Sequence, residues 1–242
     1  MEKQLFLDFV EKYSLSNTIE SVAWEVSNST LKVRIVSDDK SLLGEISTKN
    51  FDSKEFDGHK LGVNKTSEFV NILKVLQDKV EASLKLIGDK AVKIIFTDEK
   101  GTKAEYALAD LAIIQNVPPM KHIPAAYEVV VKITDDFANT FVKAKNALPD
   151  VRLFTVHATA KKAQVILGDT SINTNVITLD VETTATAAID DISFDANLFK
   201  GVLVANKGVE ATLKISSEGL ATIEYSTDAY TAKYYLVARS TN

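Results

Sequence analysis

Histidines, paired acids and glycines are the residues of this chain whose types could support catalysis or metal binding. His59, His122 and His157 stand far apart, and none lies at a metal-ligand spacing or beside a candidate nucleophile. The pairs Asp38–Asp39 and Asp190–Asp191 are typical of turns, since nothing around them indicates the burial that would separate their pKa values. Cysteine is absent, and the glycines stand singly rather than in a phosphate-binding loop. We therefore expect no enzyme, no metal site and no cofactor.

The composition is that of a soluble globular protein with a real hydrophobic core. Of 242 residues, 45% are hydrophobic and 25% are charged. The net charge of −5 argues against a protein that coats nucleic acid over its whole surface, but it allows one basic patch. The N-terminal segment MEKQLFLDFVEKYS has acids inside its apolar stretch, and no long apolar run occurs elsewhere. We expect no signal peptide, no membrane span and no membrane partner.

An internal repeat organises the chain. Residues 80–86 read VEASLKL, and residues 209–215 read VEATLKI. The same offset places Phe96 on Tyr225 and keeps other apolar positions in phase on both sides of the segment. Self-similarity at one long offset indicates a fold that occurs twice.

The boundary between the two copies falls at a proline-rich segment, NVPPMKHIPAAY. Pro118, Pro119 and Pro124 lie within it, and proline lacks the amide donor that an inner strand or helix needs. We interpret this segment as an extended connector. The predicted bounds are an N-terminal domain at 1–115, a connector at 116–126 and a C-terminal domain at 127–242.

Each half has the same expected plan of helices and strands. Two amphipathic helices are predicted in each half; the second begins at Thr66 or Ser67 as N-cap, the third at Thr134 and the fourth at Asp195. Strands follow each helix, among them TLKVRIV at 30–36 and LATIEYS at 220–226. The plan is an α+β fold of four helix-plus-antiparallel-sheet units in two similar domains.

With this plan, the chain resembles the DNA sliding clamps of T-even-type tailed bacteriophages. The resemblance is strongest in FDANLFKGVLVANKGVEATLKISSEGLATIEYSTDAYTAKYYLVA at 194–238, which has the order of the family's last quarter. The segment SEFVNILKVLQDKVEASLKL at 67–86 resembles the family's second helix and the strand after it. The resemblance implies the sliding-clamp fold.

The family's function is what the resemblance then implies. A sliding clamp is a ring of six domains around duplex DNA, so a two-domain chain is expected to form a homotrimer with head-to-tail interfaces. Its implied partners are the replicative DNA polymerase, to which it gives processivity, and an ATP-driven clamp-loader complex. The expected location is the cytoplasm of an infected bacterial host.

Lysines on the predicted helices are the candidate DNA contacts. A clamp needs weak attraction to phosphates without base readout, and lysine is a flexible, hydrated charge suited to this task. The channel residues that the resemblance implies are Lys3, Lys12, Lys74, Lys143, Lys145, Lys200 and Lys207. Taken singly, each could instead complement a helix dipole and keep the surface solvated. Their recurrence in four equivalent helices favours a basic channel.

Two further sets of residues follow from the resemblance. The strand with Ala104, Tyr106 and Leu108 would pair with a neighbour's strand of Ile177, Leu179 and Val181; otherwise both are ordinary strands covered within one subunit. Partner peptides would bind an apolar pocket beneath the connector, although core packing is the better explanation for most of these positions. The candidate pocket residues are Ile113, Ile114, Val117, Pro118, Leu236 and Val237.

Two other classes of protein remain open at this stage. One is a structural β-rich phage protein with a duplicated domain, and the other is a small-molecule-binding β-barrel. The molar mass in solution separates them from the clamp, because only the clamp requires three chains.

Overall fold

The computed structural model describes residues 1–51, 54–121, 123–159, 162–168, 174–185 and 187–239. The chain folds into two compact units. The first unit comprises Met1–Ile35, Glu45–Pro119 and Asp228–Thr231, and the second comprises Val36–Gly44, Met120–Thr227 and Ala232–Asn242. The simpler domain bounds expected from the repeat stay a prediction.

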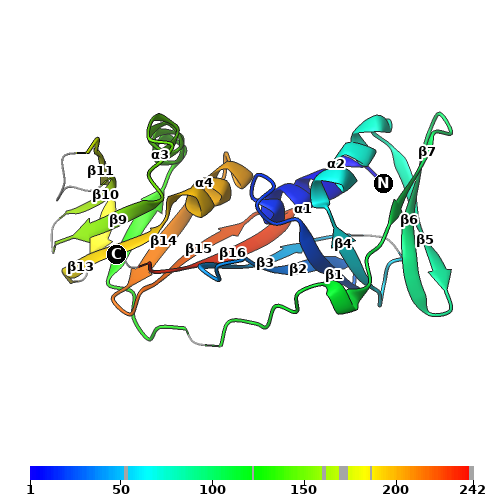
Figure 1. Cartoon of the computed structure of the whole chain (residues 1–242), viewed down its shortest axis with the longest axis horizontal. Coiled ribbons are helices and arrows are strands. Elements are labelled where there is room, and N and C mark those ends of the chain that lie inside the picture. The colour runs from blue at the N-terminus through cyan, green and yellow to red at the C-terminus, as the bar shows by residue number, and fades with distance from the viewer. Residues whose placement is uncertain (52–53, 122, 160–161, 169–173, 186, 240–242) are drawn as a thin grey trace. The chain divides into compact units, whose positions relative to one another are not determined.

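In the first half of the chain, a group of strands follows each α-helix (Figure 1). In chain order the elements are α1 (Gln4–Ser14), β1 (Ser21–Ser27), β2 (Thr30–Val36), β3 (Leu42–Thr48), β4 (Lys60–Asn64), α2 (Thr66–Val75), β5 (Val80–Ile87), β6 (Lys90–Asp98), β7 (Lys103–Ala107) and a short 3-10 helix at Leu111–Ile113. One series of neighbouring strands is β3-β2-β1-β4, and a separate sheet has the order β5-β6-β7. The strand pairs β1–β2, β1–β4, β5–β6 and β6–β7 are antiparallel.

The core of the first unit is aromatic. The apolar face predicted for α1 buries Phe6, Phe9 and Tyr13. Ring centroids of Phe9 and Trp24 lie 5.5 Å apart, and those of Trp24 and Phe69 lie 5.2 Å apart at 90°. Edge-to-face pairs of this kind stabilise a core beyond the area that they bury. They fix α1 and α2 over the same face of β1.

The start of α2 differs from the prediction. Lys65 occupies the N-cap position and its side chain makes no cap, so the expected cap by Thr66 or Ser67 is wrong. The Glu20 carboxylate, from the segment before β1, accepts hydrogen bonds from the Ser67 N–H at 3.0 Å and from its hydroxyl at 3.2 Å. A carboxylate at a helix N-terminus satisfies an otherwise unpaired amide and complements the dipole. Glu20, which is distant in sequence, therefore caps α2 in place of a neighbouring residue.

Gly62 in β4 permits a close approach of the segment that precedes the connector. The Ala109 N–H donates to the Gly62 carbonyl oxygen at 2.8 Å. A Cβ atom on residue 62 would lie 2.4 Å from the Ala109 carbonyl oxygen, which no side chain could tolerate without a backbone shift. The segment after β7 is thereby held against β4.

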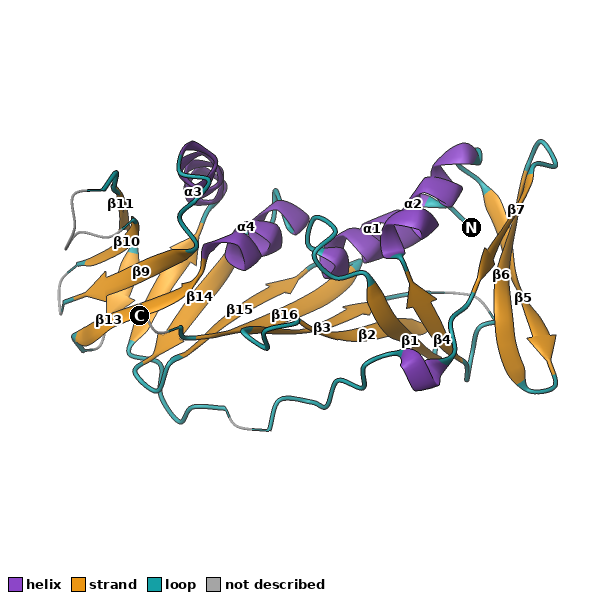
Figure 2. Ribbon diagram, viewed as in Figure 1, coloured by secondary structure: helices purple, strands orange, loops and turns teal. Residues whose placement is uncertain are grey.

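In the second half, strands again follow each α-helix (Figure 2). The elements are β8 (Val129–Ile133), α3 (Asp135–Ala147), β9 (Leu153–Ala158), β10 (Ala163–Leu167), β11 (Ile177–Val181), β12 (Thr183–Ala185), β13 (Ile189–Asp195), α4 (Ala196–Ala205), β14 (Ala211–Ser216), β15 (Leu220–Ser226) and β16 (Tyr230–Val237). One series of neighbouring strands is β12-β8-β14-β15-β16, and the other sheet is β11-β10-β9-β13.

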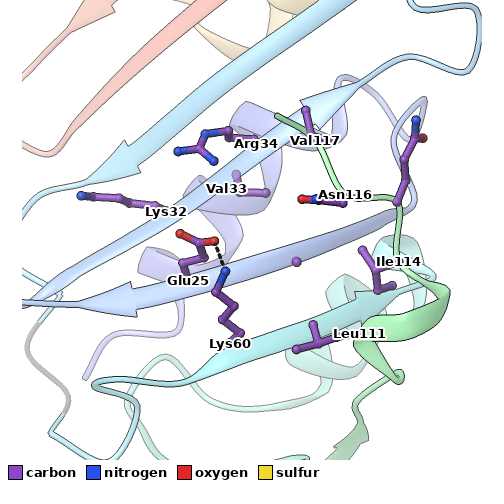
Figure 3. A pocket seen from close by; sticks show the side chains of 11 residues that line it. Glu25, Lys32, Val33, Arg34, Lys60, Leu111, Ile114, Asn116 and Val117 are labelled. Atoms are coloured by element: carbon purple, nitrogen blue, oxygen red, sulfur yellow. Dashed lines mark hydrogen bonds and ion pairs between the residues drawn. The ribbon is translucent and has the colours of Figure 1, made fainter. Parts of the chain in front are cut away.

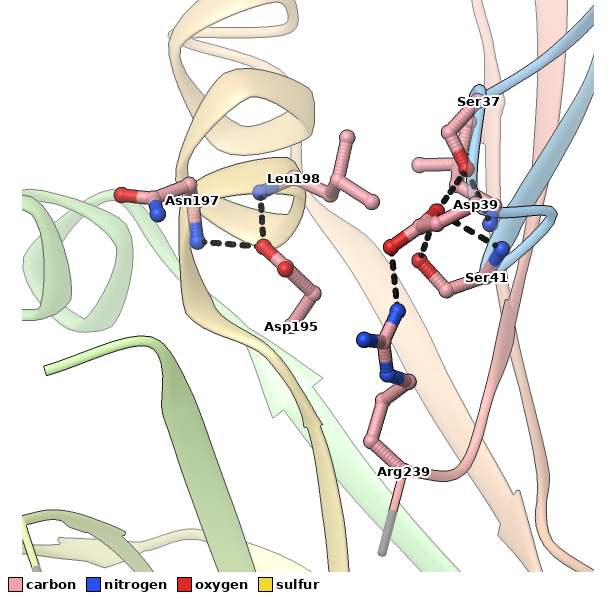
Figure 4. Close-up of polar contacts among 8 residues, drawn as sticks. Ser37, Asp39, Ser41, Asp195, Asn197, Leu198 and Arg239 are labelled. Atoms are coloured by element: carbon pink, nitrogen blue, oxygen red, sulfur yellow. Dashed lines mark hydrogen bonds and ion pairs between the residues drawn. The ribbon is translucent and has the colours of Figure 1, made fainter.

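Both predicted helix caps in this half are confirmed. The Thr134 hydroxyl accepts from the Phe137 N–H at 3.2 Å at the start of α3. The Asp195 carboxylate accepts from the N–H groups of Asn197 and Leu198 at 2.8 and 2.9 Å at the start of α4 (Figure 4). Each cap satisfies amides that the first helical turn leaves unpaired.

Phenylalanines connect α3 and α4 to the strand beneath them. Phe141, Phe154 and Phe199 are fully buried. The Phe199 ring centroid lies 4.8 Å from each of the other two. This cluster holds both helices over β9.

The repeated heptapeptide occupies equivalent places in the two halves. VEASLKL forms most of β5, and VEATLKI leads into β14, so each follows the second helix of its half. β14 also pairs with the five-residue strand β8, whereas in the first half Glu2 forms only a single bridge with Lys79. The two halves therefore share the order of their elements. They differ at the first strand, which is β8 in the second half and a single bridge in the first.

Candidate functional site

Three of the seven candidate lysines have exposed side chains whose ammonium groups are not paired with described residues. Lys74 lies in the last turn of α2, Lys143 in α3, and Lys207 just after α4. The side-chain ammonium groups of these lysines make no hydrogen bond or ion pair with any residue that the structure describes. Their ammonium groups are free to interact with an anionic partner.

Lys3 and Lys12 are held by contacts within the first unit. Lys3 Nζ donates to the Leu76 carbonyl oxygen at 2.5 Å and lies 3.5 Å from the Asp78 carboxylate, and its side chain is 14% exposed. Lys12 Nζ lies 5.0 Å from the centroid of the Tyr230 ring, a cation–π distance, and its side chain is 13% exposed. These two lysines therefore support packing.

Lys145 and Lys200 lie between α3 and α4. Lys145 is buried, and its Nζ donates to the Pro149 carbonyl oxygen at 2.9 Å just beyond the end of α3. Burial, followed by the nearby charge of Lys200, lowers the pKa of Lys145. Lys200 is half-buried and donates to Asn146 Oδ1 at 2.6 Å. Lys145 thus donates to carbonyl groups at the C-terminus of α3. This is the role of complementing the helix dipole that was the alternative to contact with DNA.

The two strands expected to pair between subunits both lie at sheet edges. β7 is an edge of β5-β6-β7, and β11 is an edge of β11-β10-β9-β13. Ala104, Leu108 and the three apolar residues of β11 (Ile177, Leu179, Val181) are half-buried. An edge strand presents backbone donors and acceptors that another strand can pair with. Whether these two strands do so stays a prediction.

Tyr106 of β7 faces inward rather than toward the edge. Its hydroxyl accepts from the Asn64 N–H at 3.1 Å and donates to the Asn64 carbonyl oxygen. Burial raises the pKa of Tyr106 to about 12. The side chain anchors β7 to the end of β4, so any contribution to an interface would come from its backbone.

A pocket of about 320 Å³ lies in the first unit, between the outer face of the sheet and the start of the connector (Figure 3). We call it the connector pocket. Its principal lining residues are Glu25, Lys32, Arg34 and Lys60 from the strands, with Ile114 from the segment just before the connector and Val117 from the connector itself. The strand residues alternate with buried residues such as Trp24, so they lie on the face opposite to the helices.

The six candidate residues for a partner-peptide pocket have different surroundings. Ile114 and Val117 line the connector pocket, whereas Ile113 is 70% exposed and Pro118 is exposed outside it. Leu236 is fully buried in the second unit, as the core-packing alternative expects, and Val237 is partly exposed.

The comparison with solved structures gives an extensive match. The crystal structure of the proliferating cellular nuclear antigen from Entamoeba histolytica aligns with 99% of this chain and 96% of its own, with a TM-score of 0.74 and 18% sequence identity. The chain has the sliding-clamp fold. The predicted α+β class is thereby confirmed. No family model matches the sequence, and no match was found among curated proteins.

The sliding-clamp fold carries a second pocket, of about 340 Å³, in the second unit. It lies over β14, β15 and β16, where Lys214, Glu224 and Lys233 line it together with Ile123 and Tyr127. The Tyr127 hydroxyl lies 3.0 Å from the Thr222 hydroxyl, and this contact holds the residue that follows the connector on the sheet.

A histidine and a carboxylate lie close together in the second unit of this sliding-clamp fold. His157 Nδ1 lies 2.7 Å from Asp191 Oδ1 at the surface, and His122 lies outside the described residues. In the part of the chain that the structure describes, no group of three or more His, Cys, Asp or Glu residues could hold a metal ion. Within the same ranges, no helix is both long and apolar enough to cross a membrane.

Proposed function

We propose that the chain is a DNA sliding clamp. Three copies form a ring around duplex DNA, and the ring tethers a replicative DNA polymerase to its template without catalysing a reaction itself. The observation that carries this proposal is that a sliding-clamp fold presents exposed lysines, with no ion pair to described residues, on or just after its helices.

The helix lysines support contact with DNA. Lys74, Lys143 and Lys207 can each approach a phosphate, and Lys200 can exchange its bond to Asn146 for one. Such contacts give weak, salt-dependent attraction without sequence readout, which is what a sliding ring needs. Because Lys3, Lys12 and Lys145 make contacts within the protein, we base the proposed channel on the other four.

The edge strands support assembly. Two similar halves per chain require three chains to complete a ring of six, and head-to-tail contacts close such a ring. Pairing of β7 with β11 of the next copy would remove two unpaired edges per interface. An ATP-driven clamp loader would open one interface to admit DNA. We also propose, from the sequence resemblance, an origin in a T-even-type phage and action in the cytoplasm of its bacterial host.

Retention on circular and on linear DNA tests the proposal, because a ring can leave DNA only over a free end. The protein is loaded onto nicked circular DNA with its loader, and retention is measured before and after a single cut makes the DNA linear. A clamp stays on the circle and slides off the linear form. Equal retention on both forms would instead indicate ordinary binding, and no retention on the circle would contradict the proposal.

The channel assignment has its own matched test. Replacing Lys74, Lys143 and Lys207 by Glu reverses three charges on or just after the helices, whereas the same change at Lys40, Lys54 and Lys85 reverses three exposed charges elsewhere. Reversing phosphate-facing charges should lower retention on circular DNA at least about tenfold, since each phosphate contact contributes to affinity. Equal losses of retention in the two variants would contradict the assignment of these lysines to the DNA channel.

A further inference from the structure

We propose that the outer edge of β5, the side that does not pair with β6, binds an extended segment of a partner protein as an added antiparallel strand. In that segment, β-branched apolar residues stand on both sides of a lysine that pairs with Glu81. The inference goes beyond DNA encirclement and does not depend on it, because β5 carries none of the lysines proposed to meet DNA.

Most of the outer edge of β5 is unpaired. β5 pairs with β6 on one side and ends the sheet β5-β6-β7 on the other (Figure 2). At the start of this edge, the Val80 N–H donates to the Met1 carbonyl oxygen at 2.9 Å, and the Met1 amino group donates to the Val80 carbonyl oxygen at 2.8 Å. Since the backbone groups of a strand point to alternate sides, Ala82 and Leu84 direct theirs to the same edge. Among the described residues, none bonds to these groups.

The internal repeat shows which kind of strand fills the equivalent edge in the second half. There, β14 pairs with β8 over five residues. Leu213 of β14 is the counterpart of Leu84 at the repeat offset and lies opposite Val131 of β8. Val131 and Ile133, two residues further on, are both buried. Apolar β-branched residues at alternate positions thus complete this edge of the sheet.

Charge at the edge of β5 favours a lysine between those two apolar residues. In the second half, Lys132 lies between the buried positions of β8, and its Nζ lies 3.9 Å from the Glu210 carboxylate. Glu81 is the counterpart of Glu210 at the repeat offset. It is exposed and makes no ion pair with any residue that the structure describes. An added strand with the order apolar, lysine, apolar would bring its lysine beside Glu81.

Main-chain hydrogen bonds would supply most of the affinity. An unpaired strand edge is recognised by another strand through its N–H and carbonyl groups, and alternate side chains give specificity. Leu84 is half-buried and Leu86 is 46% exposed, so an added strand would also cover apolar side chains of β5.

Binding of a defined peptide to the full-length protein tests the inference. The probe is fluorescein-labelled Glu-Val-Val-Val-Lys-Ile-Thr, which copies residues 128–134, followed by fluorescence anisotropy. In β8 the Lys132 N–H donates away from β14, to the Glu182 carbonyl oxygen at 3.1 Å, so the N–H groups of Val131 and Ile133 face β14. N-methylation of the peptide at the two positions that copy Val131 and Ile133 should raise the Kd at least about tenfold, since two donors to the edge are lost. N-methylation at the copies of Val130 and Lys132, whose donors face away, is the matched control.

A charge exchange tests the lysine. Glu81→Lys should raise the Kd of the probe at least about threefold, and a peptide with Glu in place of its lysine should regain the lost affinity. Glu99→Lys, at an exposed position in the same unit, should leave the Kd within about twofold of the wild type. Circular dichroism establishes that both variants are folded. In the wild type, the probe should also slow hydrogen exchange at β5.

Four outcomes would overturn the inference. They are no binding at protein concentrations up to about 1 mM, equal Kd values for the two N-methylated peptides, equal losses in Glu81→Lys and Glu99→Lys, and slowed exchange at β14 in place of β5. Self-association of the wild type that Glu81→Lys abolishes would assign the edge to a second copy instead of a partner. The retention assay on circular DNA is independent of these results, so failure of the β5 edge and failure of the clamp proposal can be told apart.

Discussion

The guanidinium group of Arg239 donates a hydrogen bond to the Asp39 carboxylate, within the second unit (Figure 4). The other oxygen of Asp39 accepts from the hydroxyls of Ser37 and Ser41, each at 2.7 Å, and from the Ser41 N–H at 3.0 Å. One carboxylate thus organises the turn between β2 and β3 and holds the chain that leaves β16. Burial alone would raise the pKa of Asp39, but the hydrogen bonds from Ser37, Ser41 and Arg239 outweigh it and lower the pKa well below its usual value.

Asp39→Asn should lower the free energy of unfolding at neutral pH by about 1 kcal/mol. This is less than a fully buried charged hydrogen bond would contribute, because the Asp39 side chain is partly exposed. The native pKa of Asp39 is below the unfolded one, so this stabilisation is present above about pH 4 and is lost as the pH falls below it. Urea unfolding at neutral and acidic pH measures both effects. Asp38→Asn, an exposed neighbour, is the control. A difference between wild type and Asp39→Asn that grows toward acid would contradict this account.

Lys145→Met should destabilise the protein by about 1–2 kcal/mol, because it removes a buried donor and leaves the carbonyl groups of Leu148 and Pro149 without that partner. Lys143→Met, two residues earlier on the exposed side of α3, should change the stability by less than about 0.5 kcal/mol. Chemical denaturation of the two variants makes the comparison. Similar small effects would show that the Lys145 contacts contribute little.

Tyr106→Phe should cost about 1 kcal/mol, since the ring still packs but both hydrogen bonds to Asn64 are lost. The native pKa of about 12 lies above the unfolded value, so the neutral phenol stabilises the fold below about pH 10, and this contribution disappears as the pH rises through about 12. The wild type should therefore lose more stability than Tyr106→Phe over that range. Unfolding curves with parallel alkaline slopes would be evidence against the assignment.

The proposed pairing of β7 with β11 can be tested by cross-linking, because the chain has no cysteine. Cysteines introduced at the exposed positions Ala107 and Thr178 should be joined between copies by bismaleimides of graded length. A denaturing gel is expected to show one, two and three linked chains. Ala107→Cys combined with Lys214→Cys, which lies on a strand paired on both sides, should give no such ladder. Linked species larger than three chains would contradict a closed ring.

The parts of the fold that depend on local chemistry were predictable from the sequence. Thr134 and Asp195 cap their helices because a cap needs only the next few amides. The start of α2 was not predictable in this way, since Glu20 reaches it from an element distant in sequence. Burial of Lys145 depends on how the chain turns at Pro149, and periodicity alone cannot show that. The connector pocket likewise requires the course of the connector over β1 and β2, which no local pattern encodes.

The molar mass in solution tests the central claim, a ring of three two-part chains, most directly. Sedimentation equilibrium of the wild-type protein over a wide concentration range, without loader or DNA, is the measurement. The account predicts a limiting mass of three chains, with dissociation only at the lowest concentrations. A mass of one chain at every concentration, or a mass that rises past three without limit, would contradict it.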